Sequence, residues 1–153
     1  MDSFGEYIIA LTLDPLLKKI LDAPVGEVEK SLRDALGCDI QLDIIEQNQI
    51  SGSNFVRKIT ITANELPVIC AIVNFDSKIL PTNVISEILQ KKDGIGTILT
   101  RNNIKANRKI ISSNYDDKLE KVTRKYQIII DDTVWFEIIE EIKLDYITSC
   151  KNG

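Results

Sequence analysis

Two charged side chains occupy positions where the surrounding sequence predicts only apolar ones. The stretch 55–63 alternates like a half-buried strand and places Arg57 on its apolar side. Near the C-terminus, the same alternation places Glu140 among apolar residues of 134–142. A buried charge is costly unless it is paired, so both must find each other, a ligand or water in a cavity. A pocket for a small anion is the functional interpretation, and a structural ion pair is the alternative.

Arginine side chains and backbone N–H groups of this chain could bind a carboxylate. The planar guanidinium of Arg57 offers two parallel donors to such a group. Burial would raise the pKa of Glu140 and a nearby arginine would lower it, so its protonation state stays open. Alternation groups Arg108 and Arg124 with apolar residues, but both lie near strand ends, where exposure is expected. A pocket role is the alternative for both, and Arg108 is the better candidate of the two. The glycines at 94–96 predict either a plain turn after a helix or backbone amides that face an anion.

The chain contains no histidine and three widely spaced cysteines. The absence of histidine excludes Ser-His and Cys-His nucleophiles and most transition-metal sites. Cysteines without a C-x-x-C spacing indicate neither a zinc site nor a disulfide framework. We therefore expect no cofactor and no metal, and chemistry that uses carboxylates, arginines, backbone amides or the substrate itself.

Length and charge limit the partners. A chain of 153 residues suits a single domain over 1–153. Its net charge of −4 repels phosphate backbones and anionic membranes, so we expect no nucleic acid and no membrane partner. The N-terminus lacks the pattern of a signal peptide, which favours a cytoplasmic protein, either a monomer or a homodimer.

The pattern of elements predicts an α+β fold. Helices are expected from Asp14-Pro15 to before Pro24, over roughly 25–36, and from Pro81 onward. Strands are expected at 40–44, 55–63, 68–75, 104–112, 122–130 and 134–142, with a polar loop at 47–53 and tight turns at 64–65 and 131–132. Because short turns join the strands and the helices are grouped, we expect about six antiparallel strands with about three helices packed on them.

The sequence resembles the chorismate pyruvate-lyase family, including its archaeal, cyanobacterial and mycobacterial branch. The resemblance covers nearly the whole chain in order. It includes the strand around Arg57, and it includes Arg108 in a later strand. The other matching segments are Leu80-Pro81, Ile88-Leu89, Gly94-Ile95-Gly96-Thr97-Ile98-Leu99, Arg124-Lys125-Tyr126-Gln127-Ile128-Ile129 and Phe136-Glu137-Ile138-Ile139-Glu140.

The resemblance implies a chorismate lyase-like fold with a small closed pocket. It also implies cleavage of chorismate to 4-hydroxybenzoate and pyruvate without a cofactor. Arg57 would hold the ring carboxylate, helped by the backbone N–H groups of Ile95 and Leu16. Glu140 would contact the ring hydroxyl, and Arg108 would hold the enolpyruvyl carboxylate. Arg57 and Glu140 are thus the expected catalytic residues.

The start of the first helix departs from that family. Members have a hydroxyl-bearing Ser or Thr there, whereas this chain has Asp14-Pro15-Leu16-Leu17. Pro15 has no N–H and Leu17 no hydroxyl, so a carboxylate would find fewer donors. A second hypothesis is a binding module, because the same fold resembles the effector-binding domain of a class of bacterial transcription regulators. Such a domain binds a small molecule and catalyses no reaction.

Overall fold

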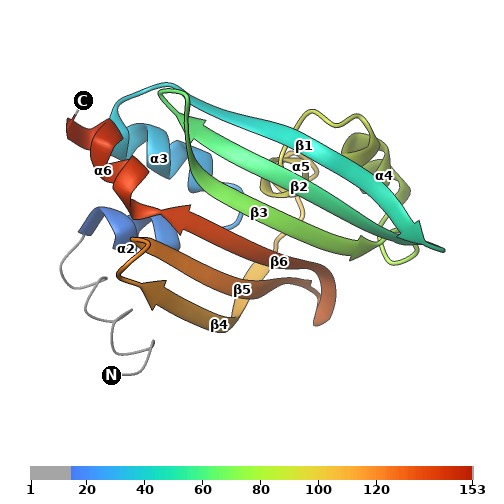
Figure 1. Cartoon of the computed structure of the whole chain (residues 1–153). Coiled ribbons are helices and arrows are strands. Elements are labelled where there is room, and N and C mark those ends of the chain that lie inside the picture. The colour runs from blue at the N-terminus through green and yellow to red at the C-terminus, as the bar shows by residue number, and fades with distance from the viewer. Residues whose placement is uncertain (1–14, 153) are drawn as a thin grey trace.

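A six-stranded antiparallel sheet organises the computed structural model, which describes residues 15–152 (Figure 1). The strand order is β1-β2-β3-β6-β5-β4, so two three-stranded units meet where β3 pairs with β6. The strands are β1 (Ile40–Ser51), β2 (Asn54–Ala63), β3 (Leu66–Asp76), β4 (Asn107–Asp116), β5 (Lys121–Ile130) and β6 (Thr133–Lys143). The predicted α+β fold with about six antiparallel strands is confirmed.

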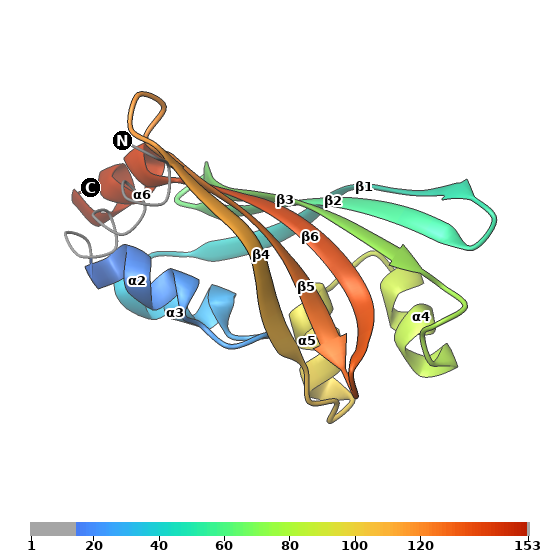
Figure 2. The same cartoon turned by 90° about the horizontal axis from the view of Figure 1, so that it is seen from below.

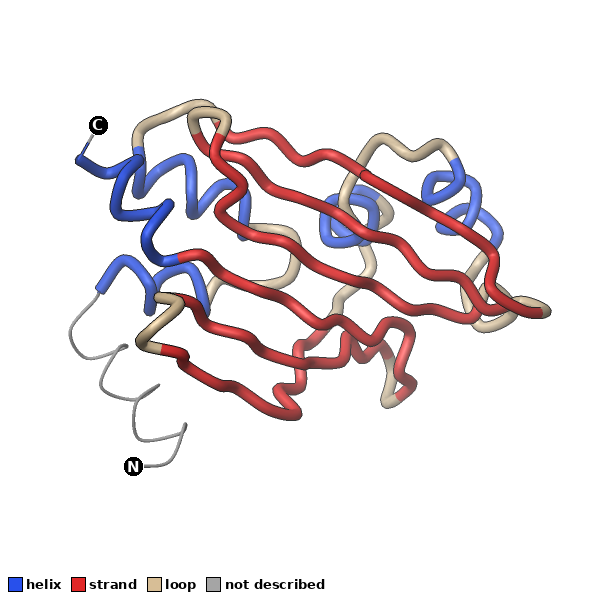
Figure 3. The backbone as a smooth tube through the Cα atoms, viewed as in Figure 1, coloured by secondary structure: helices blue, strands red, loops and turns tan. Residues whose placement is uncertain are grey.

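Helices cover one face of this sheet. Those below the sheet in Figure 2 are α2 (Pro15–Leu21), α3 (Val28–Leu36), α4 (Thr82–Leu89) and α5 (Ile95–Arg101). The last helix, α6 (Leu144–Asn152), follows β6 directly and packs against α3 and β3. Figure 3 shows the strands as one continuous layer, with helices beside it and at one end. Within residues 15–152, no helix is long and apolar enough to cross a membrane.

The strand register sets which side chains face the helices. Arg57 lies opposite Val73 on β3, and Val73 lies opposite Ile138 on β6. One step further along the inner face, Glu140 lies between Ala71 and Arg124. Period two therefore brings the misplaced charges of β2 and β6 to the same face of the sheet.

The inner face holds two apolar clusters. The first lies under α4 and α5 and includes Ile138 and Tyr126, and the second lies under α2, α3 and α6 and includes Ile142 and Val122. On β6, Glu140 falls between Ile138 and Ile142. Arg124 falls likewise between Tyr126 and Val122 on β5. Glu140 and Arg124, paired side by side, therefore lie between the two apolar clusters.

Two tight turns expected from the sequence are confirmed. At 64–65 the backbone has φ of 49° and 70°, and at 131–132 it has φ of 49° and 61°. Two consecutive positive φ angles are typical of the two-residue turns that match the twist of antiparallel strands. Both turns close hairpins, β2–β3 and β5–β6.

The prediction of three helices and of a polar loop at 47–53 was wrong. The described residues contain five helices, because α5 begins directly after Gly94 and α6 follows β6 without a loop. Strand β1 continues to Ser51, with irregular pairing between Ile44 and Glu46 and again between Gln49 and Ser51. An irregularity of this kind interrupts the alternation of apolar and polar residues, which is why the strand resembled a loop.

Candidate ligand-binding site

A cavity of about 90 Å³ lies between the inner face of the sheet, the α2–α3 connection and the start of α5. Four of the five predicted site residues line it: Arg57, Ile95, Arg108 and Glu140. The fifth, Leu16, lies in the first turn of α2 and is described by its backbone alone, and Asp14 lies outside the described residues. The walls are mainly apolar and include Val25, Val28, Leu42, Ile59, Ile61, Ile69, Ala71, Val73, Ile128 and Ile138.

Arg57 is fully buried and bound by the protein itself. Its Nε donates to Gln47 Oε1 at 2.8 Å, its Nη1 to the Asp93 carbonyl at 2.7 Å and its Nη2 to the Ile88 carbonyl at 2.8 Å. Burial lowers the pKa of Arg57 to about 10, and the negative charge of Asp93 partly opposes this shift. The guanidinium therefore remains charged at neutral pH. These partners leave the alternative ion pair with Glu140 unformed.

Gln47 is a site residue that the sequence analysis missed. Its side chain is 9% exposed, accepts the bond from Arg57 and donates Nε2 to the Ile88 carbonyl at 3.2 Å. The interpretation of 47–53 as a polar loop concealed it. An amide on an edge strand opposite a buried arginine was the available signal, since Gln47 pairs directly with Arg57 in the sheet.

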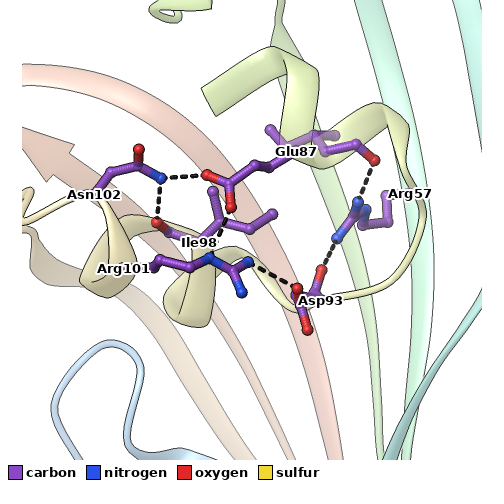
Figure 4. Close-up of polar contacts among 7 residues, drawn as sticks. Arg57, Glu87, Asp93, Ile98, Arg101 and Asn102 are labelled. Atoms are coloured by element: carbon purple, nitrogen blue, oxygen red, sulfur yellow. Dashed lines mark hydrogen bonds and ion pairs between the residues drawn. The ribbon is translucent and has the colours of Figure 1, made fainter. Parts of the chain in front are cut away.

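A polar network fixes the segment between α4 and α5 (Figure 4). Arg101 donates to Glu87 and to Asp93, at 2.7 Å each, and Asn102 contacts Glu87 as well. Arg57, on β2, donates to the same segment from the side of the sheet, through the Ile88 and Asp93 carbonyls. The cavity wall around Ile95 is therefore held from both sides.

Glu140 is paired within the sheet. Its Oε1 accepts from Arg124 Nε at 2.6 Å, and its Oε2 accepts from the Tyr126 hydroxyl at 3.1 Å. Burial, and then the charge of Glu140, raise the pKa of Tyr126, so this hydroxyl remains a donor at neutral pH. Glu140 thus lines the cavity with its charge already matched by Arg124.

The expectation that Arg124 is exposed was wrong. Only 2% of it is exposed, and its Nη1 donates to the Leu21 carbonyl at the end of α2 at 2.9 Å. Because α2 covers this part of β5, a strand end that resembles a surface position is buried. The alternation with Val122 and Tyr126 was the correct signal, and it outweighed the position near the strand end.

Arg108 completes a cationic cluster around Tyr126. Its Nη1 donates to the Ala23 carbonyl at 2.6 Å, and the guanidinium carbons of Arg108 and Arg124 lie 4.8 and 4.9 Å from the ring centre of Tyr126. Cations over an aromatic ring are attracted by its electrons. Two buried donors, Arg108 Nε and Arg124 Nη2, have no hydrogen-bond partner within the described part of the chain.

The charge of the cavity favours an anion. Arg57 and Arg108 line it as cations, whereas the charge of Glu140 is matched by Arg124. Glu29 also lines it, and burial raises the pKa of this carboxyl against the opposing charge of Arg33. Among residues 15–152, no cluster of three His, Cys, Asp or Glu side chains could hold a metal ion. The arrangement can bind and orient a small acid through guanidinium groups.

The glycines near α5 serve a close approach between two backbones. A Cβ on Gly96 would lie 2.5 Å from the backbone nitrogen of Gly26 and 2.6 Å from its Cα. Gly26 itself has φ of 91°, and a Cβ there would lie 2.4 Å from the Thr100 hydroxyl. The α2–α3 connection therefore packs directly on α5 and closes the cavity, which gives these glycines a structural reason independent of any anion.

Gly96→Ala is accordingly expected to destabilise the protein by about 1–3 kcal/mol, because the new methyl group meets backbone that cannot rotate away. Helix propensity alone predicts the opposite sign, a gain of about 1 kcal/mol. Urea unfolding measures the difference. Thr97→Ala, at the next position of the same helix, is the control and should change stability by no more than about 0.5 kcal/mol. An increase in stability for Gly96→Ala would disprove the close packing.

Comparison with known proteins identifies the fold. No protein-family model and no curated protein matches the chain. The effector domain of PhnF from Mycobacterium smegmatis is similar in structure, with a TM-score of 0.55 and 9% identity over 80% of this chain and 91% of that domain. PhnF from the same organism gives a TM-score of 0.54 and 9% identity over 77% of this chain and 64% of that one. The expected chorismate lyase-like fold, which effector domains of GntR regulators share, is confirmed.

Proposed function

We propose that this protein binds a small organic acid in the cavity beneath the sheet. The observation that carries the proposal is a pair of buried guanidinium donors without a partner among residues 15–152: Arg108 Nε, at a cavity whose other walls are mainly apolar, and Arg124 Nη2, next to the lining residues Tyr126 and Glu140. Buried charged donors gain free energy when an oxyanion accepts from them. A non-catalytic binding module is consistent with the structural similarity to an effector domain.

Cleavage of chorismate is a second candidate function. It is favoured because four residues that the resemblance assigns to the substrate, Arg57, Ile95, Arg108 and Glu140, line one cavity. The elimination forms an aromatic ring, so the driving force lies in the substrate and the protein need only fix its conformation. The lyase assignment requires Arg57 and Glu140 to contact the substrate in addition to their present partners.

One experiment tests both functions. Purified protein is titrated calorimetrically with chorismate, 4-hydroxybenzoate, benzoate and octanoate, and chorismate mixtures are assayed for 4-hydroxybenzoate and pyruvate. Saturable binding without turnover supports the binding module, whereas turnover lost in Arg108→Gln supports the lyase. A bound acid at one hundred times its Kd should stabilise the fold by about 2.7 kcal/mol. The proposal fails if none of the four acids binds at millimolar concentration.

A further inference from the structure

We propose that the acid group of the ligand is held by Arg108 and Arg124 beside Tyr126, and not by Arg57. The ligand class that follows is a monocarboxylate with an apolar body. This inference rests on the proposed function, since it assigns an orientation and a chemical class to the ligand of the same cavity.

The first argument is the state of the donors. Arg57 makes three hydrogen bonds within the protein, one from each nitrogen. Arg108 and Arg124 each retain a buried nitrogen without a partner in the described chain. Arg108 lines the cavity, and Arg124 lies directly behind it, against the lining residues Tyr126 and Glu140. Since buried polar groups are almost always hydrogen-bonded, these two nitrogens indicate the position of a missing acceptor. The missing acceptor would lie beside Tyr126, whereas each nitrogen of Arg57 already donates a hydrogen bond within the protein.

The second argument is charge. Arg124 and Arg108 together carry two positive charges, and the one acid bonded to them among the described residues is Glu140. Their remaining partners are the Leu21 and Ala23 carbonyls, which accept hydrogen bonds but carry no net charge. One positive charge therefore stays unmatched beside Tyr126. Arg57 and Glu29, the other charged residues that line the cavity, have opposite formal charges, so the net formal charge of the whole group is +1 and a single negative group would neutralise it. A monoanion satisfies this balance.

The third argument is the surface on which the rest of the ligand would lie. The residues beside Tyr126 and Glu140 in the sheet are hydrocarbon: Ile59, Ala71, Val73, Ile128 and Ile138. A sugar or polyol placed there would lose hydrogen bonds to water without replacing them. An aromatic ring or a short alkyl chain loses none, so the cavity suits an apolar body attached to one carboxylate.

The orientation is tested by calorimetric titration of benzoate into matched variants. Arg108→Gln removes the charge and the Nε donor, and Arg108→Lys keeps the charge but loses that donor. Arg124→Lys does the same at the second position. The control is Lys109→Gln, because Lys109 is the next residue on β4 and is exposed. We expect at least a tenfold loss of affinity for each arginine variant and less than a twofold change for the control, with circular dichroism showing that each variant is folded.

Each outcome has a distinct meaning. If wild-type protein binds benzoate and the Arg108 and Arg124 variants bind it equally well, the orientation is wrong while the proposed function stands. If benzamide binds as tightly as benzoate, no anion site exists. If phenyl phosphate binds tighter than benzoate, the ligand class is not a monocarboxylate. If no acid binds wild-type protein, the proposed function itself fails.

Discussion

Replacing Glu140 with leucine is expected to lower the free energy of unfolding by about 3–5 kcal/mol at neutral pH. The loss arises because Arg124 is 2% exposed and Glu140 is its bonded acid in the described chain, at 2.6 Å. Without the carboxylate, the guanidinium remains charged in an apolar surrounding and the Tyr126 hydroxyl loses its acceptor. Urea unfolding followed by fluorescence of the single tryptophan measures the change.

A double-mutant cycle separates the pair from the loss of packing. Arg124→Met alone should destabilise the protein as well, whereas the double variant Arg124→Met/Glu140→Leu should recover a large part of the loss, because no charge then remains unpaired. Glu141→Leu is the control, since Glu141 is only partly buried and its pairs with Lys121 and Lys143 are partly exposed. It should cost no more than about 1 kcal/mol. Additive single effects would show that Arg124 and Glu140 are not coupled.

The sequence was sufficient to predict two of the inward-facing polar side chains, but not Gln47 or Arg124. Arg57 and Glu140 were placed on the inner face by alternation alone, and both are buried at one cavity. This succeeded because a strand has a side-chain period of two, and a shift by one residue would expose every apolar neighbour. The pairing of β2 with β3 and of β5 with β6 followed from the tight turns at 64–65 and 131–132, whereas the pairing of β3 with β6 was not predicted.

The partners of these charges could not be predicted from the sequence. The arginines bond to the backbone carbonyls of Leu21, Ala23, Ile88 and Asp93, and every residue has such a carbonyl. Which carbonyl lies nearby depends on where α2 and α4 end over the sheet. The irregular pairing in β1 concealed Gln47 in the same way, because it broke the alternation that revealed Arg57.

The glycines at 94–96 show how two interpretations can share one sequence. A turn after a helix and a loop with amides toward an anion both require glycine. The structure adds a third reason, the contact between Gly96 and Gly26, which lie seventy residues apart in the chain. No local pattern records such a contact, because it depends on how the α2–α3 connection packs on α5.

Arg57→Met is expected to lower the free energy of unfolding by about 3 kcal/mol, whether or not a ligand is present. The substitution removes three hydrogen bonds and leaves the Asp93 carbonyl and Gln47 Oε1 without the donor they now have. Each buried acceptor left unpaired costs about 1–3 kcal/mol. Loss of the charge from an apolar site offsets part of this cost. Urea unfolding measures the total.

The same variant should loosen one particular segment. Arg57 ties β2 to the connection between α4 and α5, so amide hydrogen exchange over residues 90–96 should accelerate more than exchange in β5 and β6. Arg101→Met is the control, because Arg101 bonds to the same segment from the exposed side. A surface pair of this kind contributes about 1 kcal/mol or less.

Stability and affinity together decide the role of Arg57. If Arg57 supports the cavity wall, Arg57→Met should reduce stability strongly and should reduce benzoate affinity only because the wall loosens. Arg57→Lys should then retain part of both the stability and the affinity. If Arg57 instead holds the carboxylate, Arg57→Met should leave the stability within about 0.5 kcal/mol of wild type and should abolish benzoate binding. The second result would show that the ligand's carboxylate binds to Arg57 and not to Arg108 and Arg124. The unpaired nitrogens of Arg108 and Arg124 would then face an apolar or neutral part of the ligand, which the cost of unpaired buried donors argues against.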